Sequence, residues 1–364
     1  MRSSRAARRW RLGLVGFGQL GRAVVSLLAT KQVQLCEQGV DFVVTMVATR
    51  HGGMRCDSHG LPFEDLLGSG PAEGSLIATE EQIAAALADP STPIDILIEA
   101  SPPDHESGEP AGGYIRAALS AGRHVVTANK GPIAWSGREL EEEARARGLS
   151  LRYEATLMGC LPVMVLRESA LPLARVVSFL ALPNATTNYL LAEMGRGQTF
   201  DQALEGARSL GIVEADPSED TEGWDAVLKA TILHNLLFEG AQPITPSLVQ
   251  RVGLSQVDLK WIRETALAGG GVKAVARGTP GGPVSVDFEA FGASQAVSSL
   301  PGSSMYLELD TDLAGRISIA LESPAVGQSA YAVLMDLLAV DRAAMDDMAP
   351  RLASRSSPQV GGQV

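Results

Sequence analysis

The sequence predicts an α/β protein, in which a doubly wound parallel sheet is followed by an α+β domain with a mixed sheet. Three observations carry this prediction. Short apolar runs alternate with helical segments over the first 150 residues, a glycine-rich turn joins the first run to the first helix, and four strand-like runs follow a helical region in the second half. A length of 364 residues accommodates two domains of ordinary size.

In the first half, strand and helix signals alternate, which favours parallel strands joined by helical crossovers. The predicted strands are Trp10–Gly16, Asp41–Thr49, Ile94–Ala100 and His124–Ala128, and the second half begins with a further predicted strand, Leu151–Leu157. The predicted helices are Gln19–Thr30, Glu80–Ala88, Gly112–Ala121 and Ser136–Arg147, and residues 50–75 are expected to be rich in loops. We therefore assign residues 1–150 to one domain.

The second half has a different pattern. Its predicted elements are a helix over Pro162–Ser169, a strand over Val176–Leu182, helices through most of Thr186–Ala268, and strands at Val272–Arg277, Val284–Phe288, Met305–Leu309 and Ile317–Leu321. Since the last four runs follow one another closely, we expect them in one mixed or antiparallel sheet. We assign residues 151–322 to this domain. A helix near Ser329–Ala339, within about 323–345, is expected to return to the first domain, and 349–364 to be disordered.

Composition excludes several classes of protein. A net charge of −12 gives no electrostatic support for a nucleic-acid surface, and a hydrophobic fraction of 45% excludes global disorder. No apolar run has the length of about 18 residues that a membrane span requires. Three scattered cysteines are too few for a disulfide framework, which favours a reducing compartment and a cytoplasmic location.

A glycine-rich turn of the GxGxxG type stands between the first predicted strand and helix. In that setting the first glycine permits the tight turn, the second lets backbone amides approach a pyrophosphate, and the third allows close helix–strand packing. The pattern predicts a Rossmann-type dinucleotide site; the alternative is a turn that binds nothing. The residues of this predicted site are Gly16, Phe17, Gly18, Gln19, Leu20 and Gly21.

The end of the second strand usually selects the cofactor, because an acid there binds the ribose hydroxyls of NAD. Here the strand ends Ala48-Thr49-Arg50, without an acid. Arg50 is placed to bind the 2′-phosphate of NADP, so the sequence favours NADP over NAD. The alternative is that Arg50 is a solvated loop residue.

An acidic segment from Glu214 to Lys229 precedes an apolar helix. Asp225 and Lys229 are four residues apart and share one helix face. Lysines number only five against 25 arginines, and a buried lysine, unlike an arginine, can lose its proton. Lys229 is therefore a candidate for proton exchange with a reacting oxygen, with Glu214 or Asp225 binding a substrate ammonium. The spacing alone also fits a surface ion pair.

Several motifs, in one order along the chain, resemble the homoserine dehydrogenase family. They are TANK at Thr127–Lys130, YEAT…G.LP at Tyr153–Pro162, N.TTNY at Asn184–Tyr189, EADPSxDxxGxDAxxK at Glu214–Lys229, and a weaker match at Ser323–Leu337. With the N-terminal fold they cover most of the chain. The resemblance implies NAD(P)-dependent interconversion of L-homoserine and L-aspartate 4-semialdehyde, in the biosynthesis of threonine, methionine and isoleucine.

The resemblance also implies residue roles. Lys229 matches the lysine that transfers the proton, Asp225 the acid that orients it, Lys130 a lysine near the nicotinamide, and Glu214 the acid that binds the substrate amino group. The other matches are Asp220 and Thr186 on the substrate side and Ser101 near the cofactor. Because one ammonium lowers the pKa of another, we expect one of the two lysines to act as a base near neutral pH.

Some positions depart from the family's pattern. Residues Met158, Cys160, Ala181 and Ala185 stand where the pattern has glycine, Ile212 replaces an aromatic residue, and the C-terminal turn reads Ser323-Pro324-Ala325-Val326. Added side chains near a ligand narrow a pocket. Two alternatives therefore stay open: a dehydrogenase of a related amino alcohol or amino aldehyde, and a non-catalytic NADP-binding homologue.

The resemblance implies further partners. Some members of the family bind a monovalent cation such as Na⁺ through backbone carbonyls, and the matching positions are Glu154, Leu157, Gly159 and Leu161. The alternative is a structural loop in which Glu154 pairs with a cation of the protein. The strands over 272–321 resemble a dimer-forming sheet, which implies a homodimer. The match is to a short form without a C-terminal ACT domain, so we expect no threonine inhibition through one.

Overall fold

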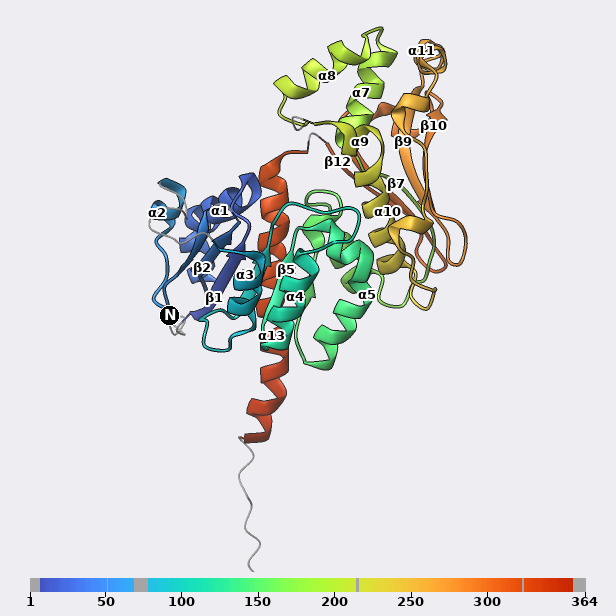
Figure 1. The fold of residues 1–364 in the computed structure, drawn as a ribbon. Helices are drawn as coiled ribbons and strands as arrows, with labels where there is room; N and C mark the ends of the chain where they lie inside the picture. Colours follow the sequence, from blue (N-terminus) through green and yellow to red (C-terminus); the bar gives the residue numbers. More distant parts are fainter. Residues whose placement is uncertain (1–6, 51, 69–77, 214–215, 323, 356–364) are drawn as a thin grey trace, which may run out of the picture.

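Two six-stranded sheets organise the chain, one in each half of the sequence (Figure 1). The computed structural model describes residues 7–50, 52–68, 78–213, 216–322 and 324–355. The predicted fold class is confirmed: a doubly wound sheet precedes an α+β unit with a mixed sheet. No helix in these ranges is long and apolar enough to cross a membrane.

The first sheet has the strand order β3-β2-β1-β4-β5-β6. Its strands are β1 (Arg8–Val15), β2 (Val40–Thr49), β3 (Gly53–Cys56), β4 (Ile96–Glu99), β5 (His124–Thr127) and β6 (Leu151–Arg152). All neighbours are parallel except β2 and β3. The chain reverses direction across the sheet after β3, which places a topological switch point between β1 and β4.

Helices cover both faces of this sheet. They are α1 (Gln19–Glu37), α2 (Phe63–Gly68), α3 (Glu80–Ala88), α4 (Ala111–Ser120), α5 (Lys130–Ala146) and the C-terminal α13 (Val326–Arg355). The returning helix packs against α1, with Val333 and Leu337 buried in the same cluster as Val25 and Leu28. Asp341 of α13 also pairs with Arg8 at 2.5 Å. The last helix thus completes the first sheet's shell.

The second sheet has the order β12-β11-β7-β9-β10-β8. Its strands are β7 (Val176–Leu182), β8 (Gln250–Arg251), β9 (Gly271–Gly278), β10 (Ser285–Phe291), β11 (Met305–Thr311) and β12 (Gly315–Leu321). All neighbours are antiparallel except β8 and β10. The four closely spaced strands do share a mixed sheet, as predicted; β7 lies between the pairs β11–β12 and β9–β10, and β8 is added at the edge beside β10.

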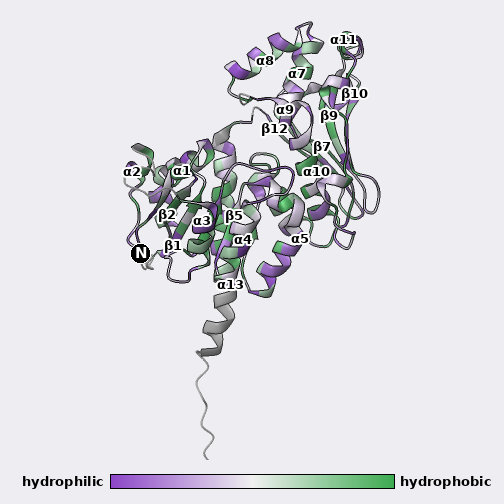
Figure 2. Cartoon of the chain, viewed as in Figure 1, coloured by the Kyte–Doolittle hydropathy of each residue, from purple (hydrophilic) through white to green (hydrophobic). Residues whose placement is uncertain are grey.

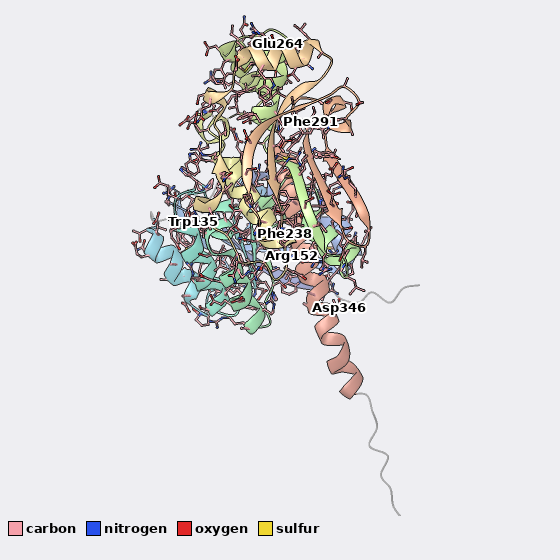
Figure 3. All side chains as sticks on the ribbon, turned by 90° about the vertical axis from the view of Figure 1, so that its right-hand side faces the viewer. Trp135, Arg152, Phe238, Glu264, Phe291 and Asp346 are labelled. Carbon is pink, nitrogen blue, oxygen red and sulfur yellow. The ribbon has the colours of Figure 1, made fainter. Side chains whose placement is uncertain are left out.

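The helices of the second half lie mainly against one face of that sheet. They are α6 (Val163–Val165), α7 (Ala185–Gly195), α8 (Phe200–Ser209), α9 (Ser218–Thr221), α10 (Trp224–Leu237), α11 (Leu259–Leu267) and, on the opposite face, α12 (Ala296–Ser299). Every residue from 226 to 234 in α10 is buried, because this helix packs against both α5 and the second sheet. Figure 3 shows Phe238, just after α10, near the middle of the molecule and Phe291 and Glu264 toward one end.

Several predicted boundaries are wrong. The strand expected over 151–157 ends at Arg152, because a 3-10 turn over Glu154–Thr156 follows. The expected loop over 50–75 contains β3 and α2. Helix α5 begins at Lys130 rather than at Ser136, where it has a kink; only the part after the kink carries the run of charges that the sequence shows.

The C-terminal helix is also longer than expected. It continues to Arg355, through residues expected to be disordered, and residues 356–364 lie outside the described ranges. Figure 2 shows the green apolar strands of both sheets covered by helices with mixed purple and green faces, so that two adjoining cores form.

Candidate active site

A cavity of about 910 Å³ lies at the carboxyl ends of β1, β2 and β4, the edge at which an open α/β sheet binds ligands. Its walls come from the glycine-rich turn, the loops after β2, β4 and β5, helices α3 and α4, and the start of α13. Among the lining residues are Gly16, Phe17, Gly18, Gln19, Leu20, Arg50, Ser101, Tyr114 and Lys130. Five of the six predicted positions in the glycine-rich turn thus line the same cavity as Arg50, Ser101 and Lys130.

The glycines of the turn have the geometry that a pyrophosphate requires. Gly16 has a φ of +93°, and a Cβ there would lie 2.3 Å from the carbonyl oxygen of Ala100. A Cβ at Gly21 would lie 2.5 Å from the carbonyl oxygen of Gly16, whereas a Cβ at Gly18 would meet nothing within 4 Å. Gly18 also precedes α1 without a capping side chain, so the first amides of α1 are available to phosphate oxygens. The residues present fit a dinucleotide.

Buried hydrogen bonds hold the opposite wall in place. The carboxylate of Glu99 accepts hydrogen bonds from the backbone amide of Ser101 at 2.9 Å, from the Ser101 hydroxyl, and from the Thr127 hydroxyl at 3.1 Å. Burial raises the pKa of Glu99 to about 7, against these donors. Asn129 caps α5 and donates to the Ser101 carbonyl. Ser101 and the first residue of α5, Lys130, are therefore held on the cavity wall.

Lys130 connects this cavity to the acidic segment. Its Nζ lies 3.2 Å from Oδ1 of Asp225, and Nζ of Lys229 lies 2.8 Å from Oδ2 of the same carboxylate. Lys229 also donates to the carbonyl oxygen of Pro183 at 2.8 Å, and Asn184 donates to Asp225 at 2.8 Å. One carboxylate thus contacts two ammonium groups from two halves of the fold.

Charge balance in this cluster determines its ionisation. Burial alone would raise the pKa of Asp225, but Lys229 and Lys130 hold it well below its ordinary value. Burial lowers the pKa of Lys130, and Asp225 more than offsets this, so the net shift is upward. The expectation that one lysine depresses the other's pKa is therefore wrong for Lys130, because the carboxylate lies between the two amines.

Asn184 is a site residue that the sequence did not single out. It caps α7, and its Nδ2 donates to Asp220 at 2.6 Å as well as to Asp225. Burial and the charge of Asp225 raise the pKa of Asp220. Its position at the head of the N.TTNY motif, directly before a helix, was the available signal. Thr186 donates instead to the carbonyl oxygen of Ile212 at 2.6 Å.

An aromatic stack joins the cavity loop to the start of α10. The ring of His105, in the loop after β4, stacks on Trp224 with centroids 5.1 Å apart, and the guanidinium carbon of Arg251 lies over the Trp224 ring, 4.3 Å from its centroid. His105 Nδ1 is 3.1 Å from Glu219, and its carbonyl oxygen accepts a hydrogen bond from Trp135. The loop that lines the cofactor cavity is thus fixed against the helix of Asp225 and Lys229.

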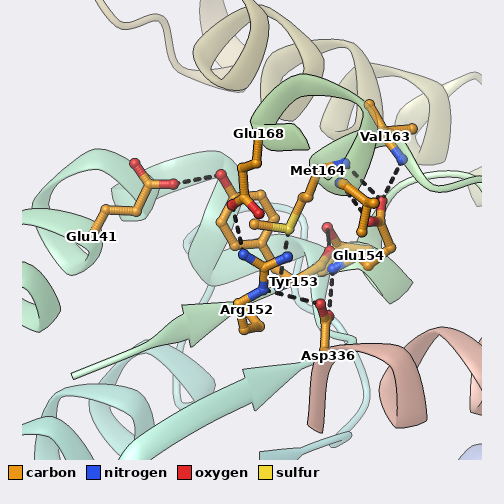
Figure 4. Close-up of polar contacts among 10 residues, drawn as sticks. Glu141, Arg152, Tyr153, Glu154, Val163, Met164, Glu168 and Asp336 are labelled. Atoms are coloured by element: carbon orange, nitrogen blue, oxygen red, sulfur yellow. Dashed lines mark hydrogen bonds and ion pairs between the residues drawn. The ribbon is translucent and has the colours of Figure 1, made fainter. Parts of the chain in front are cut away.

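Glu154, one of the predicted cation positions, belongs to a second buried acidic cluster (Figure 4). The carboxylate of Glu154 accepts hydrogen bonds from the amides of Val163 at 2.7 Å and Met164 at 3.0 Å, and the amide of Glu154 donates to Asp336 at 2.8 Å. Asp336 also pairs with Arg152 at 3.2 Å. Burial raises the pKa of Glu154 to about 7 and that of Asp336 to about 6.

Oxygen atoms of this loop that could bind a cation already accept hydrogen bonds from the protein. The Glu154 carboxylate receives the amides at the start of α6, and the carbonyl of Leu161 accepts the Val163 amide. Carbonyl oxygens of Leu157 and Gly159 stand in the same turn, where Gly159 has a φ of +62°. Glu154 therefore acts as a helix cap here, rather than pairing with a cation of the protein.

Other predicted positions vary in outcome. Glu214 lies outside the described residues, as do His51 and Ser323. Lys229 is nearly buried and, in the described part of the chain, stands behind Asp225 rather than in the cavity wall. Met158 and Ala181 are fully buried in the core, so their added side chains fill the interior and not the cavity.

Family comparisons agree with this geometry. A family model described as homoserine dehydrogenase, NAD binding domain, matches residues 16–154, and one described as homoserine dehydrogenase matches residues 162–338. An NAD(+)-dependent homoserine dehydrogenase from Pseudomonas canavaninivorans is 30% identical over 343 residues, 92% of this chain and 97% of the relative. A homoserine dehydrogenase from Sulfurisphaera tokodaii is 28% identical over 91% of this chain and 99% of the relative.

Solved structures are similar over nearly the whole chain. A homoserine dehydrogenase from Thiobacillus denitrificans superimposes with a TM-score of 0.78 at 25% identity, covering 97% of this chain and 77% of that one. A hyperthermophilic archaeal homoserine dehydrogenase in complex with NADPH superimposes with a TM-score of 0.75 at 26% identity, covering 92% and 98%.

Proposed function

The chain belongs to the homoserine dehydrogenase family, as an NAD(P)-dependent oxidoreductase acting on a CH–OH group, and on this premise we propose which of its residues carry the reaction. The observation that supports the assignment most strongly is the shared carboxylate: Asp225 contacts Lys229 at 2.8 Å and Lys130 at 3.2 Å. Lys130 in turn lines the cavity that fits the cofactor.

We propose that Lys229 exchanges the proton of the substrate. In the oxidative direction its amine accepts the proton of the homoserine hydroxyl, and in the reductive direction its ammonium donates a proton to the aldehyde oxygen. Asp225 fixes the direction of the amine, and the ammonium of Lys130 stabilises negative charge that develops on the reacting oxygen. When bound, the nicotinamide supplies the hydride chemistry.

Substrate binding is assigned to the acidic segment. We propose that Asp220 and Glu214 bind the amino group of the substrate and that Thr186 shapes that side of the pocket. Support comes from the position of Asp220, which shares the amide of Asn184 with Asp225 and so lies beside the proton-transfer group. Ser101 and the turn Gly16–Gly21 are assigned to the cofactor.

Among the two nicotinamide cofactors we propose a preference for NADP. Arg50 lines the cavity at the end of β2, where the 2′-phosphate of NADP binds in sheets of this type. Purified protein should reduce NADP with homoserine at a higher kcat/KM than NAD. A higher kcat/KM with NAD would contradict this preference while leaving the dehydrogenase assignment in place.

The central experiment is an assay of homoserine oxidation with Lys229→Met. Loss of the amine should lower kcat by about 10²- to 10⁴-fold, because it removes the proposed general acid–base group. Lys260→Met is the matched control, since Lys260 is largely exposed and pairs with Glu264. Retained turnover in Lys229→Met, with intact folding by circular dichroism, would disprove the assigned role.

Further proposals concern a cation site, the oligomeric state and the division into domains. We propose that a monovalent cation binds the carbonyl oxygens of Leu157, Gly159 and Leu161 beside Glu154; replacing Na⁺ with tetramethylammonium should then lower the Tm. We also propose a cytoplasmic homodimer formed through the second sheet, which a molecular mass from light scattering tests. The division into domains of 1–150 and 151–322 stays a proposal that limited proteolysis tests.

A further inference from the structure

The adenosine end of the cofactor cavity contains a charge pair that the assignment of NADP to Arg50 does not explain. Arg50 Nη1 lies 3.6 Å from Oε1 of Glu80, the first residue of α3. Arg50 follows β2 and lines the cavity, and Ile83 of the same helix as Glu80 lines it too. The arginine that lines the cavity therefore has a carboxylate partner on the protein.

The position of Glu80 is well defined by its helix. Thr79 caps α3 with a complete capping box, in which its hydroxyl accepts from the Gln82 amide and the Gln82 side chain accepts from the Thr79 amide. On the other side of the pair, the hydroxyl of Thr49, the residue before Arg50, accepts the amide of Gly52 at 2.8 Å. Both partners of the ion pair thus project from anchored backbone.

The charge of Glu80 also reaches the inner wall of the cavity. Tyr114 is only 3% exposed and lines the cavity. Burial raises the pKa of its phenol to about 12, with Glu80 as the strongest contributing charge and Arg50 acting in the opposite direction. Glu80, Arg50 and Tyr114 therefore share one electrostatic environment at this end of the cavity.

The two cofactors differ in what they would place beside this pair. NAD has a neutral ribose 2′-hydroxyl, which can donate a hydrogen bond to a carboxylate, whereas NADP has a 2′-phosphate that a carboxylate repels and a guanidinium attracts. In sheets of this type one residue after β2 usually makes the choice. Here the base lines the cavity and its acidic partner comes from a second element, the first turn of α3.

We propose, resting on the proposed function, that Glu80 is a specificity-determining residue that competes with the cofactor 2′-phosphate for Arg50 and accepts the 2′-hydroxyl of NAD. The pair lowers discrimination between the two cofactors. Both side chains are about half exposed, so the effect of each is moderate.

The test measures nucleotide binding to the protein by isothermal titration calorimetry, with 2′,5′-ADP and ADP as probes. In Glu80→Gln the Kd for 2′,5′-ADP should fall about fivefold, since a charge about 4 Å away in a watery site changes binding by roughly that factor. The Kd for ADP should rise about twofold. The ratio of the two constants should therefore change by about tenfold in favour of the phosphorylated nucleotide.

Glu81→Gln is the matched control, because it removes the same charge from the same helical turn. The Glu81 carboxylate accepts a hydrogen bond from Thr79 and is not the partner of Arg50. Its ratio of dissociation constants should stay within twofold of the wild type. An equal change in both variants, or a ratio in Glu80→Gln within twofold of the wild type, would overturn the inference.

Arg50→Gln separates this inference from the function on which it rests. If Arg50→Gln weakens 2′,5′-ADP and Glu80→Gln has no effect, the role of Glu80 is wrong and the NADP assignment stands. If Arg50→Gln leaves 2′,5′-ADP binding unchanged, both are wrong. Absence of homoserine oxidation by the wild type would contradict the proposed function alone, because neither probe takes part in turnover.

Discussion

Two buried carboxylate clusters in this chain have opposite charge balance. Asp225 lies between Lys130 and Lys229, and its pKa is held well below the ordinary value. Glu154 and Asp336 face each other with one cation, Arg152, and their pKa values rise to about 7 and about 6. Burial acts in the same direction at both places, so the number of nearby cations decides the difference.

The two clusters have different roles: the Asp225 cluster is suited to proton transfer, and the Glu154–Asp336 cluster to holding the fold together. A carboxylate with two ammonium neighbours stays ionised and can orient an amine for proton transfer. A carboxylate that caps a helix through the amides of Val163 and Met164 holds the connection between the two halves instead. Only the first cluster touches a residue of the cofactor cavity, Lys130. The four predictions that follow perturb one cluster or the other.

The largest effect is expected from Asp225→Asn. This change leaves Lys130 and Lys229 without their shared counter-charge, so kcat should fall about 10²-fold and the free energy of unfolding by about 3 kcal/mol. Steady-state kinetics and urea unfolding measure both. Glu264→Gln, in an exposed pair with Lys260, should change neither. A loss of kcat at unchanged stability would mean that the lysines have other partners.

Asp336→Ala should lower the stability of the protein and leave its catalytic rate unchanged. It removes the acceptor of the Glu154 amide and a partner of buried Arg152, which costs about 3 kcal/mol. Urea midpoints should fall, while kcat of the folded fraction stays within twofold. The matched control is Asp312→Ala, which breaks an exposed pair with Arg175 and should cost under about 1 kcal/mol. A catalytic defect would place the second cluster in the reaction.

The pH dependence of the free energy of unfolding should reflect the raised pKa of Glu154. Because its folded pKa of about 7 exceeds its ordinary 4.5, the unfolded chain releases this proton first, and stability falls as pH rises between those values. The contribution is about 2 kcal/mol, and Glu154→Gln should remove it. Unfolding curves at pH 5 and pH 7.5 give the comparison. If wild type and variant lose stability in parallel, the raised pKa is wrong.

The smallest effect is expected from Trp224→Phe. The smaller ring keeps part of its contact with His105 and Arg251, so the start of α10 shifts only slightly. KM for homoserine should rise about two- to fivefold with kcat within twofold. Trp261→Phe, on α11, is a control that should leave KM unchanged. A fall in kcat without a change in KM would place the stack in the proton transfer instead.

Much of the site was accessible to sequence reasoning. The glycine turn, Arg50 and the pair Asp225–Lys229 lie where local patterns predicted them, because each depends on a few consecutive residues around one turn or one helix face, and Ser101 lines the cavity as the family resemblance implied. The contact of Lys130 with Asp225 was beyond local patterns, since it joins the starts of two helices far apart in the chain.

Other misses have the same cause. The end of β6 lies beside the contact of the Glu154 amide with Asp336, a residue far away in the sequence. Of the two lysines expected to include a base near neutral pH, Lys130 has a raised pKa because α10 brings the carboxylate of Asp225 to it.

The sequence by itself determined the doubly wound sheet, the mixed sheet and the family, since hydrophobic period and motif order are written along the chain. Tertiary structure decided which charges meet: two lysines on one aspartate, Arg152 on Asp336, and a glutamate beside the arginine of the cofactor cavity. Coulomb interactions fall with distance in space and are indifferent to distance in sequence, so ionisation and specificity follow only from the folded arrangement.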